Sequence, residues 1–125
     1  MNKIYTDKAP AAVGPYSQAI KVNGMVFTSG QIALDPVSGD IVGEDVVAQA
    51  HQVMKNLHQV LAAAGTKQEN VIKTTCFLAN MDDFAAFNEV YAQYFTEKPA
   101  RSCVAAKTLP KNVLCEVEVI AVVEE

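Results

Sequence analysis

The stretch VLCEVEVIAVV, residues 113–123, decides the fold, because its side chains alternate in character as those of a strand do. Successive side chains of a strand point to opposite faces of a sheet, so every second residue shares a face. One face is apolar throughout and comprises Cys115, Val117, Val119, Ala121 and Val123. The other is apolar apart from two carboxylates and comprises Leu114, Glu116, Glu118, Ile120 and Val122.

The second face of this strand predicts an oligomer. Two helices of a small domain can cover one face of a sheet, but the other face then needs a different partner. Large exposed apolar patches usually mark interfaces, and half of the residues in this chain are hydrophobic. We therefore predict a homo-oligomer that buries the second face, with Glu116 at or near the interface.

Two segments have the periodicity of helices. Residues 45–64 repeat apolar side chains at spacings of three and four, namely Val46, Ala50, Val53, Leu57, Val60, Leu61 and Ala64. Gly65 is well placed to end this helix. A second helix is expected after a cap at Asp82 or Asp83, ending at residues 96–99. Its stripe consists of Phe84, Phe87, Tyr91 and Tyr94.

Shorter apolar runs predict the remaining strands, at residues 3–6, 18–22, 25–31, 71–78 and 101–106. Asn23-Gly24 separates two of them and supplies the positive φ angles of a type I′ hairpin turn. The resulting order is βββαβαββ. It predicts one α+β domain spanning the whole chain, 1–125, with a single sheet and two helices on one face.

Charge and composition argue against two classes of partner. The net charge is −4 and the ten lysines and arginines are scattered, so no nucleic-acid partner is expected. No apolar run approaches the roughly 18 residues of a membrane helix, so no membrane partner is expected. The three cysteines lack CxxC spacing, and residues 1–7 lack the apolar core of a signal peptide. We therefore expect a cytoplasmic protein with free thiols.

Two charged residues are candidates for chemistry. Arg101 is the only arginine in the chain, and a guanidinium can grip a carboxylate through two parallel hydrogen bonds. A surface arginine or a structural ion pair is the alternative. Glu116 lies on a strand buried on at least one side, where desolvation raises a carboxyl pKa and suits proton transfer near neutral pH. Glu118 shares its face and competes for the role, and a solvated glutamate remains the alternative.

Thiol, imidazole and cofactor chemistry is less well supported. Cys103 shares a strand face with Arg101, but a catalytic thiol needs an activating group, so a small buried hydrophobic residue is favoured. His51 and His58 lie seven residues apart on one helix, whereas zinc ligands on a helix are three or four apart, so no metal is expected. The chain has no Walker, GxGxxG, GxSxG or HExxH motif, which leaves nucleotide cofactors and hydrolase triads unsupported.

Two loop positions complete the candidates. Tyr16 follows Gly14-Pro15 and can present its ring and hydroxyl at a cleft. Gly30, after Ser29, ends a strand and permits close approach to the backbone. A core tyrosine and an ordinary turn are the respective alternatives.

Several motifs in one register resemble the RidA/YjgF family. They are PAAVGPYSQA at 10–19, FTSGQ at 27–31, PARSCV at 99–104, LP at 109–110 and EVE at 116–118. The resemblance covers almost the whole chain, and the PARS block with a downstream EVE is specific to the family. It implies a chorismate-mutase-like fold and a homotrimer, with a central barrel of sheets and three clefts between subunits.

The same resemblance implies a function. The deaminase branch of the family hydrolyses enamines and imines such as 2-aminoacrylate and 2-aminocrotonate to 2-keto acids and ammonia, without a cofactor. By position, Arg101 matches the arginine that binds the substrate carboxylate, and Glu116 matches the glutamate that holds the hydrolytic water. The expected cleft-lining residues are Tyr16, Ser29, Gly30, Asn88 and Cys103.

The sequence departs from the family pattern at two places, and two other functions are alternatives to the deaminase. Residues 96–99 form a loop about four residues shorter than is usual, next to the cleft, and Cys115 replaces an aliphatic residue. A non-catalytic trimer that senses 2-keto acids would use the same Arg101. An endoribonuclease or translation inhibitor is the second rival, and the missing basic stripe argues against it.

Overall fold

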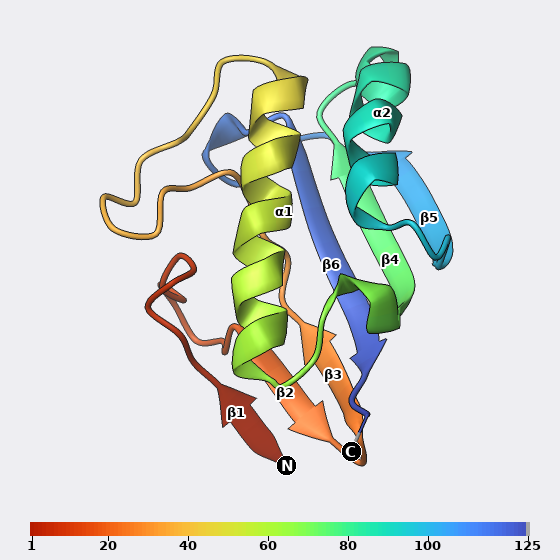
Figure 1. The fold of residues 1–125 in the computed structure, drawn as a ribbon. Coiled ribbons are helices and arrows are strands. Elements are labelled where there is room, and N and C mark those ends of the chain that lie inside the picture. Colours follow the sequence, from red (N-terminus) through yellow and green to blue (C-terminus); the bar gives the residue numbers. More distant parts are fainter. Residues whose placement is uncertain (125) are drawn as a thin grey trace.

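A computed structural model describes residues 1–124 as one mixed six-stranded sheet with two helices (Figure 1). The sheet order is β1-β2-β3-β6-β4-β5. The strands are β1 (Asn2–Ile4), β2 (Ala19–Val22), β3 (Met25–Thr28), β4 (Val71–Leu78), β5 (Ala100–Ala105) and β6 (Cys115–Val122). The helices are α1 (Val46–Ala63) and α2 (Phe84–Tyr94), and three short 3-10 helices are η1 (Gln68–Asn70), η2 (Met81–Asp83) and η3 (Pro110–Asn112).

The predicted α+β class and element order are confirmed. Neighbouring strands pair antiparallel except β4 and β5, which run parallel because α2 connects them. Both helices lie against the same face of the sheet (Figure 1). None of the helices in residues 1–124 is long and apolar enough to cross a membrane.

The alternation along β6 is confirmed by burial. Cys115, Val117, Val119 and Ala121 are buried under the helices, whereas Glu116, Ile120 and Val122 are half-buried and Glu118 is exposed. Pairing extends the uncovered face sideways, since Phe27 lies opposite Ile120. Phe77 lies opposite Glu116 on one side and Val104 on the other. Phe27 and Val104 are 40% and 49% exposed, so an apolar sheet face remains open in the single chain.

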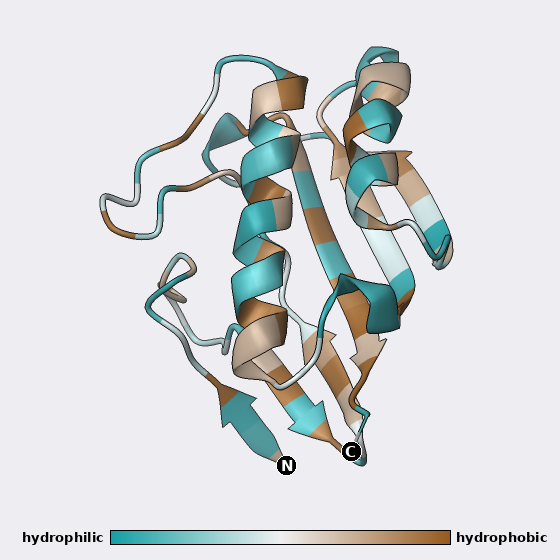
Figure 2. Ribbon diagram, viewed as in Figure 1, coloured by the Kyte–Doolittle hydropathy of each residue, from teal (hydrophilic) through white to brown (hydrophobic). Residues whose placement is uncertain are grey.

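Helix α1 begins and ends as predicted. Asp45 caps it, with its Oδ1 accepting a hydrogen bond from the Ala48 N–H at 2.8 Å, and Gly65 follows its last turn with φ +86°. Its outward side is hydrophilic (Figure 2). One polar residue outside the predicted apolar stripe is also buried: Asn56 is only 1% exposed. Its Nδ2 donates to the carbonyls of Ile32 and Leu34, which ties the segment after β3 to the helix.

Some predicted boundaries and one cap were wrong. β1 is Asn2–Ile4 rather than 3–6. β3 stops at Thr28 rather than residue 31, because the Val119 N–H bonds to Thr28 Oγ1 and pairing with β6 resumes one residue out of register at Gln31 and Val117. Helix α2 has no side-chain cap from Asp83, because η2 precedes it and Asn80 caps η2. The hairpin turn was right: Asn23 and Gly24 both have positive φ, +51° and +72°.

Gln18 organises the loop between β1 and β2. Its side chain is 2% exposed, and its Oε1 accepts from the Thr6 N–H at 2.7 Å. Its Nε2 donates to the carbonyls of Thr6 at 3.0 Å and Pro10 at 2.8 Å. This buried amide therefore replaces the strand pairing that residues 6–17 lack.

Gln18→Leu is expected to lower the free energy of unfolding by about 2 kcal/mol, since it leaves a buried N–H and buried carbonyls without partners. The measurement is the urea midpoint of unfolding. Gln93→Leu, at an exposed position on α2, is the matched control and should change the free energy by less than about 0.5 kcal/mol. Equal midpoints for the two variants would contradict this role for Gln18.

Candidate functional site

The candidate residues fall into two groups on opposite faces of the sheet. Arg101 pairs with Thr74 and Cys103 with Cys76, and the Thr74 and Cys76 side chains are buried on the helix-covered face. Glu116 pairs with Phe77, whose side chain takes the other face because strand side chains alternate. Within one chain, the sheet therefore separates Arg101 from Glu116.

The first group is built around Arg101 by one stripe of α2. Phe84, Asn88 and Tyr91 recur at spacings of four and three, so their side chains share one side of the helix. Arg101 Nη1 donates to Asn88 Oδ1 at 2.6 Å. The guanidinium carbon lies 4.7 Å from the centre of the Tyr91 ring and 5.4 Å from that of Phe84. Arg101 and Asn88, which were predicted separately as site residues, thus meet in the structure.

Within residues 1–124, Arg101 has aromatic and amide neighbours but no carboxylate within 4.0 Å. Among residues 1–124 the one ion pair within 4.0 Å joins Lys67 to Glu69, both exposed and remote in sequence from Arg101. A half-buried guanidinium without a counter-ion keeps donors available for an anion. The first group is therefore suited to binding a carboxylate or a similar anion.

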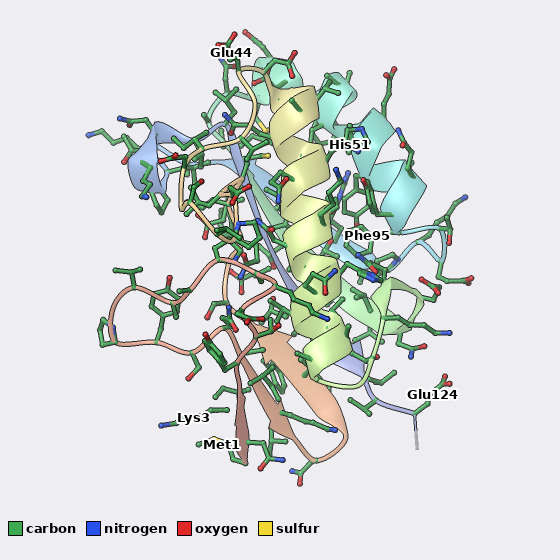
Figure 3. All side chains as sticks on the ribbon, turned by 60° about the vertical axis from the view of Figure 1, so that its left-hand side comes forward. Met1, Lys3, Glu44, His51, Phe95 and Glu124 are labelled. Atoms are coloured by element: carbon green, nitrogen blue, oxygen red, sulfur yellow. The ribbon has the colours of Figure 1, made fainter. Side chains whose placement is uncertain are left out.

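A cavity of about 300 Å³ opens beside Arg101. Its wall continues from Asn88 and Tyr91 into the loop after α2. This loop begins at Phe95, which is labelled in Figure 3. Lys98 in this loop adopts φ +54°, and its N–H bonds to the Phe95 carbonyl at 3.2 Å, which makes the connection to β5 tight. The short loop predicted to border the cleft, residues 96–99, does line this cavity through Thr96, Lys98 and Pro99.

Cys103 lies two residues beyond Arg101 on the same face and is half-buried. Burial raises the pKa of its thiol, and the positive charge of Arg101 only partly opposes this. The thiol is thus protonated near neutral pH, and a protonated thiol is a poor nucleophile. The two histidines are bonded elsewhere: His51 Nδ1 lies 2.8 Å from Tyr94 Oη and His58 Nδ1 lies 3.0 Å from Gln68 Oε1.

The second group surrounds a cavity of about 400 Å³ at the end of β3. Four predicted residues line it together: Tyr16, Ser29, Gly30 and Glu116. Ser29 Oγ donates to the Ser17 carbonyl at 2.6 Å, which joins the end of β3 to the loop that carries Tyr16. Tyr16 itself is 54% exposed and lies at the rim.

Gly30 is required by space rather than by backbone conformation. A Cβ atom at this position would collide with the carboxylate of Glu116 and would lie 2.8 Å from its Cδ. The φ angle of Gly30 is not in the positive range that favours glycine. The Glu116 carboxylate therefore lies directly over the backbone of Gly30.

Glu116 and Glu118, which the sequence left as competitors, differ in environment. Glu116 is half-buried, whereas Glu118 is exposed. Desolvation raises the pKa of Glu116, and the negative charge of Glu118 raises it further. A carboxyl with an elevated pKa can both accept and return a proton near neutral pH, so Glu116 is the better candidate acid–base group.

Gly30→Ala is expected to displace the Glu116 carboxylate and to lower turnover about fivefold, because a shift of about 1 Å disrupts a positioned catalytic group. The measurement is kcat for imine hydrolysis, the activity implied by the resemblance of the sequence to the RidA/YjgF family. Gly24→Ala, at a turn where φ of +72° strains any side chain but an added Cβ meets nothing within 4 Å, is the control for general destabilisation and should keep kcat. A Gly30→Ala protein with unchanged kcat would show that the Glu116 position is unimportant.

Sequence reasoning missed three contributors. Phe84 and Tyr91 were assigned only to the apolar stripe of a helix, yet both contact Arg101. Gln18 was assigned to a strand, yet it holds the Tyr16 loop. The available signal was Asn88, a polar residue spaced four from Phe84 and three from Tyr91 within an apolar stripe.

The matches to known proteins cover both groups of site residues. A family model described as Endoribonuclease L-PSP matches residues 6–123. A RutC family protein of Synechocystis is 57% identical, covering 98% of this chain and 96% of the relative. The 2-iminobutanoate/2-iminopropanoate deaminase of Salmonella typhimurium is 49% identical, covering 95% of each chain. The crystal structure of E. coli TdcF with bound serine has a TM-score of 0.94 at 44% identity, covering 99% of this chain and 100% of that one.

Proposed function

Because this chain belongs to the RidA/YjgF family, also described as Endoribonuclease L-PSP, we propose that it is an imine deaminase, a hydrolase acting on C=N bonds. Its substrates are 2-iminobutanoate and 2-iminopropanoate, which arise from the enamines 2-aminocrotonate and 2-aminoacrylate. The products are the corresponding 2-keto acids and ammonia. The deaminase from Salmonella, similar over nearly the whole chain, supports this assignment.

The observation that carries the proposal is the unpaired Arg101. Its guanidinium is held by Asn88 and two aromatic rings but has no carboxylate partner within the described chain. A small imino acid has one strongly interacting group, its carboxylate, and a guanidinium can bind a carboxylate through two parallel hydrogen bonds. TdcF was crystallised with serine, a small amino acid with the same group, and this supports such a ligand here.

The proposed site combines two copies of the chain. Arg101 and Asn88 lie on the helix-covered face, whereas Tyr16, Ser29, Gly30 and Glu116 lie at the other cavity, so one copy alone cannot bring both groups to one substrate. The open apolar face of the sheet, with Phe27 and Val104 exposed, supports association through that face. We place three such sites between the subunits of a homotrimer.

The mechanism needs only a carboxylate anchor, a positioned water and a proton carrier. Arg101 of one subunit orients the imine by its carboxylate. Glu116 of a neighbouring subunit takes a proton from water as the water oxygen adds to the imine carbon, and passes that proton to the imine nitrogen, forming a carbinolamine. The same carboxylate then moves the hydroxyl proton of the carbinolamine to its nitrogen, the C–N bond breaks, and ammonia leaves a C=O group behind. The imine carbon is already electrophilic, so no cofactor is required.

The test is a coupled assay in which a pyridoxal-phosphate-dependent threonine dehydratase generates 2-aminocrotonate. Appearance of 2-oxobutanoate is followed with and without this protein, at a dehydratase concentration that keeps enamine release fast. We expect the protein to accelerate keto-acid formation and ammonia release together. Equal rates with and without it would reject the deaminase and favour a binding role.

The elevated pKa of Glu116 predicts that activity falls at a higher pH, on acidification, than it would with an ordinary glutamate as base. Desolvation and the charge of Glu118 raise this pKa above the ordinary 4.5, so the carboxylate needed as base is lost at a higher pH than an ordinary glutamate would lose it. The measurement is kcat against pH. Glu118→Gln removes the second cause and should move this fall in activity to lower pH. A fall that stays in place in this variant would contradict the assignment.

The proposed partners and location follow the same chemistry. The ligand is a small carboxylate and the macromolecular partner is the chain itself. The three cysteines are free, which supports a reducing compartment, and we place the reaction in the cytoplasm. With a net charge of −4, the chain lacks the positive excess that supports nucleic-acid binding.

A further inference from the structure

We propose that Tyr91, anchored by Thr74, is a positioning residue that holds the Arg101 guanidinium in the orientation that receives the substrate carboxylate. This inference rests on the proposed function and adds to it the element that preorganises the anion site. It assigns a role in substrate binding to two residues of the helix–sheet contact that the reaction itself does not touch.

The first step is that the Tyr91 ring forms a platform under the Arg101 guanidinium. An arginine side chain has several rotatable bonds, and ordering it at the moment of binding reduces affinity. The Tyr91 ring lies 4.7 Å from the guanidinium carbon, within the range of a cation–π contact. Because the guanidinium is planar, a ring beneath it restricts tilting, and the bond from Nη1 to Asn88 Oδ1 restricts rotation in the plane. The donors left over remain available toward the cavity.

The second step is that the platform is itself fixed. Tyr91 is buried, and its hydroxyl lies 2.8 Å from Thr74 Oγ1 in a buried hydrogen bond. The ring of Phe95 packs against it at a centroid distance of 4.7 Å. A tyrosine held at both its ring and its hydroxyl has little freedom to follow a moving guanidinium.

The third step is that Thr74 and Arg101 are neighbours in the sheet. Thr74 on β4 is the direct neighbour of Arg101 on β5 in the parallel register. Thr74, which anchors the platform, and Arg101, which lies on it, are therefore side by side on neighbouring strands. Helix α2 supplies Tyr91 between them, so a shift of α2 against the sheet would break both contacts together.

The test compares variants in the coupled assay and in calorimetric titration with 2-oxobutanoate, a stable carboxylate product. Tyr91→Leu removes the ring and should raise KM and the dissociation constant about fivefold while kcat changes less than about twofold. Tyr91→Phe keeps the ring and should rescue most of this loss. Thr74→Val removes only the anchor and should raise KM about twofold.

The matched control is Val90→Ala, which opens the core on the same helix at a buried residue outside the side that carries Phe84, Asn88 and Tyr91. It should lower thermal stability like Tyr91→Leu but leave KM within about 1.5-fold of the wild type. Equal KM values for Tyr91→Leu and Val90→Ala would overturn the positioning role, as would a Tyr91→Phe protein as impaired as Tyr91→Leu. If Tyr91→Leu does not fold, Thr74→Val and Tyr91→Phe decide, and an unchanged KM in Thr74→Val overturns the anchor.

Failure of this inference is distinguishable from failure of the proposed function. A wild-type protein without deaminase activity rejects the function, and the titration with 2-oxobutanoate then tests Tyr91 on carboxylate binding alone. An active wild type with a fully active Tyr91→Leu variant rejects only the positioning role.

Discussion

Arg101→Ala is expected to lower kcat/KM for 2-iminobutanoate at least about tenfold. The substrate is a small carboxylate with few other handles, so much of its binding depends on one charge-assisted contact. Such a hydrogen bond contributes about 1.5–3 kcal/mol, and 1.4 kcal/mol corresponds to one decade in rate. The measurement is the coupled keto-acid assay on a variant whose oligomeric mass is verified by light scattering.

Arg101→Lys is the matched variant. An ammonium keeps the charge but cannot form the planar two-pronged contact, and it loses the donor to Asn88 and the stacking on Tyr91. It should therefore recover only part of the lost efficiency. An assembled Arg101→Ala protein with wild-type efficiency would place the anion site elsewhere and remove the basis for the first group of residues.

Glu116→Gln is expected to lower kcat about a hundredfold, since acid–base groups typically contribute that much or more. The amide keeps the size and much of the hydrogen bonding of the carboxyl but cannot accept the proton of water. KM should change little, because the carboxylate of the substrate is bound by the other group of residues. Steady-state kinetics at several substrate concentrations separates the two parameters.

Glu118→Gln is the control for Glu116, because it removes a neighbouring charge from the exposed position on the same strand face. It should lose less than about threefold in kcat at neutral pH, where its neighbour stays ionised. Comparable losses in the two variants would leave the base unassigned, and a fully active Glu116→Gln protein would exclude general base catalysis by this residue.

Mixing the two impaired variants, Arg101→Ala and Glu116→Gln, tests the composite site directly. In subunits exchanged at random in a one-to-one ratio, half carry Arg101 and half carry Glu116, so about a quarter of the sites between subunits carry both. Mixed assemblies of Arg101→Ala and Glu116→Gln should regain about that fraction of wild-type activity. If the mixture stays as inactive as its parts, the two groups do not act on one substrate.

Much of the fold could be predicted because its signals are local. The period of two along β6 identified which residues face the helices, and the burial of Val117 and Val119 agrees. The period of α1, its cap at Asp45 and its stop at Gly65 depend only on neighbouring residues, as does the Asn23-Gly24 turn. Boundaries such as the early end of β3 could not be predicted, because a residue distant in sequence interrupts the pairing: the Val119 N–H bonds to the side chain of Thr28 rather than to a backbone carbonyl.

The sequence by itself determined the class of the domain, the apolar second face of the sheet and the candidate residues. Only the tertiary structure decided how these residues are grouped, since strand pairing joins residues far apart in the chain. Parallel pairing of β5 with β4 puts Arg101 beside Thr74 and against the ring of Tyr91. The Glu116 carboxylate lies over the backbone of Gly30 on the opposite face. Alternation along a strand is a local property, whereas the choice of neighbouring strands depends on the whole packed core, which no single stretch of residues specifies.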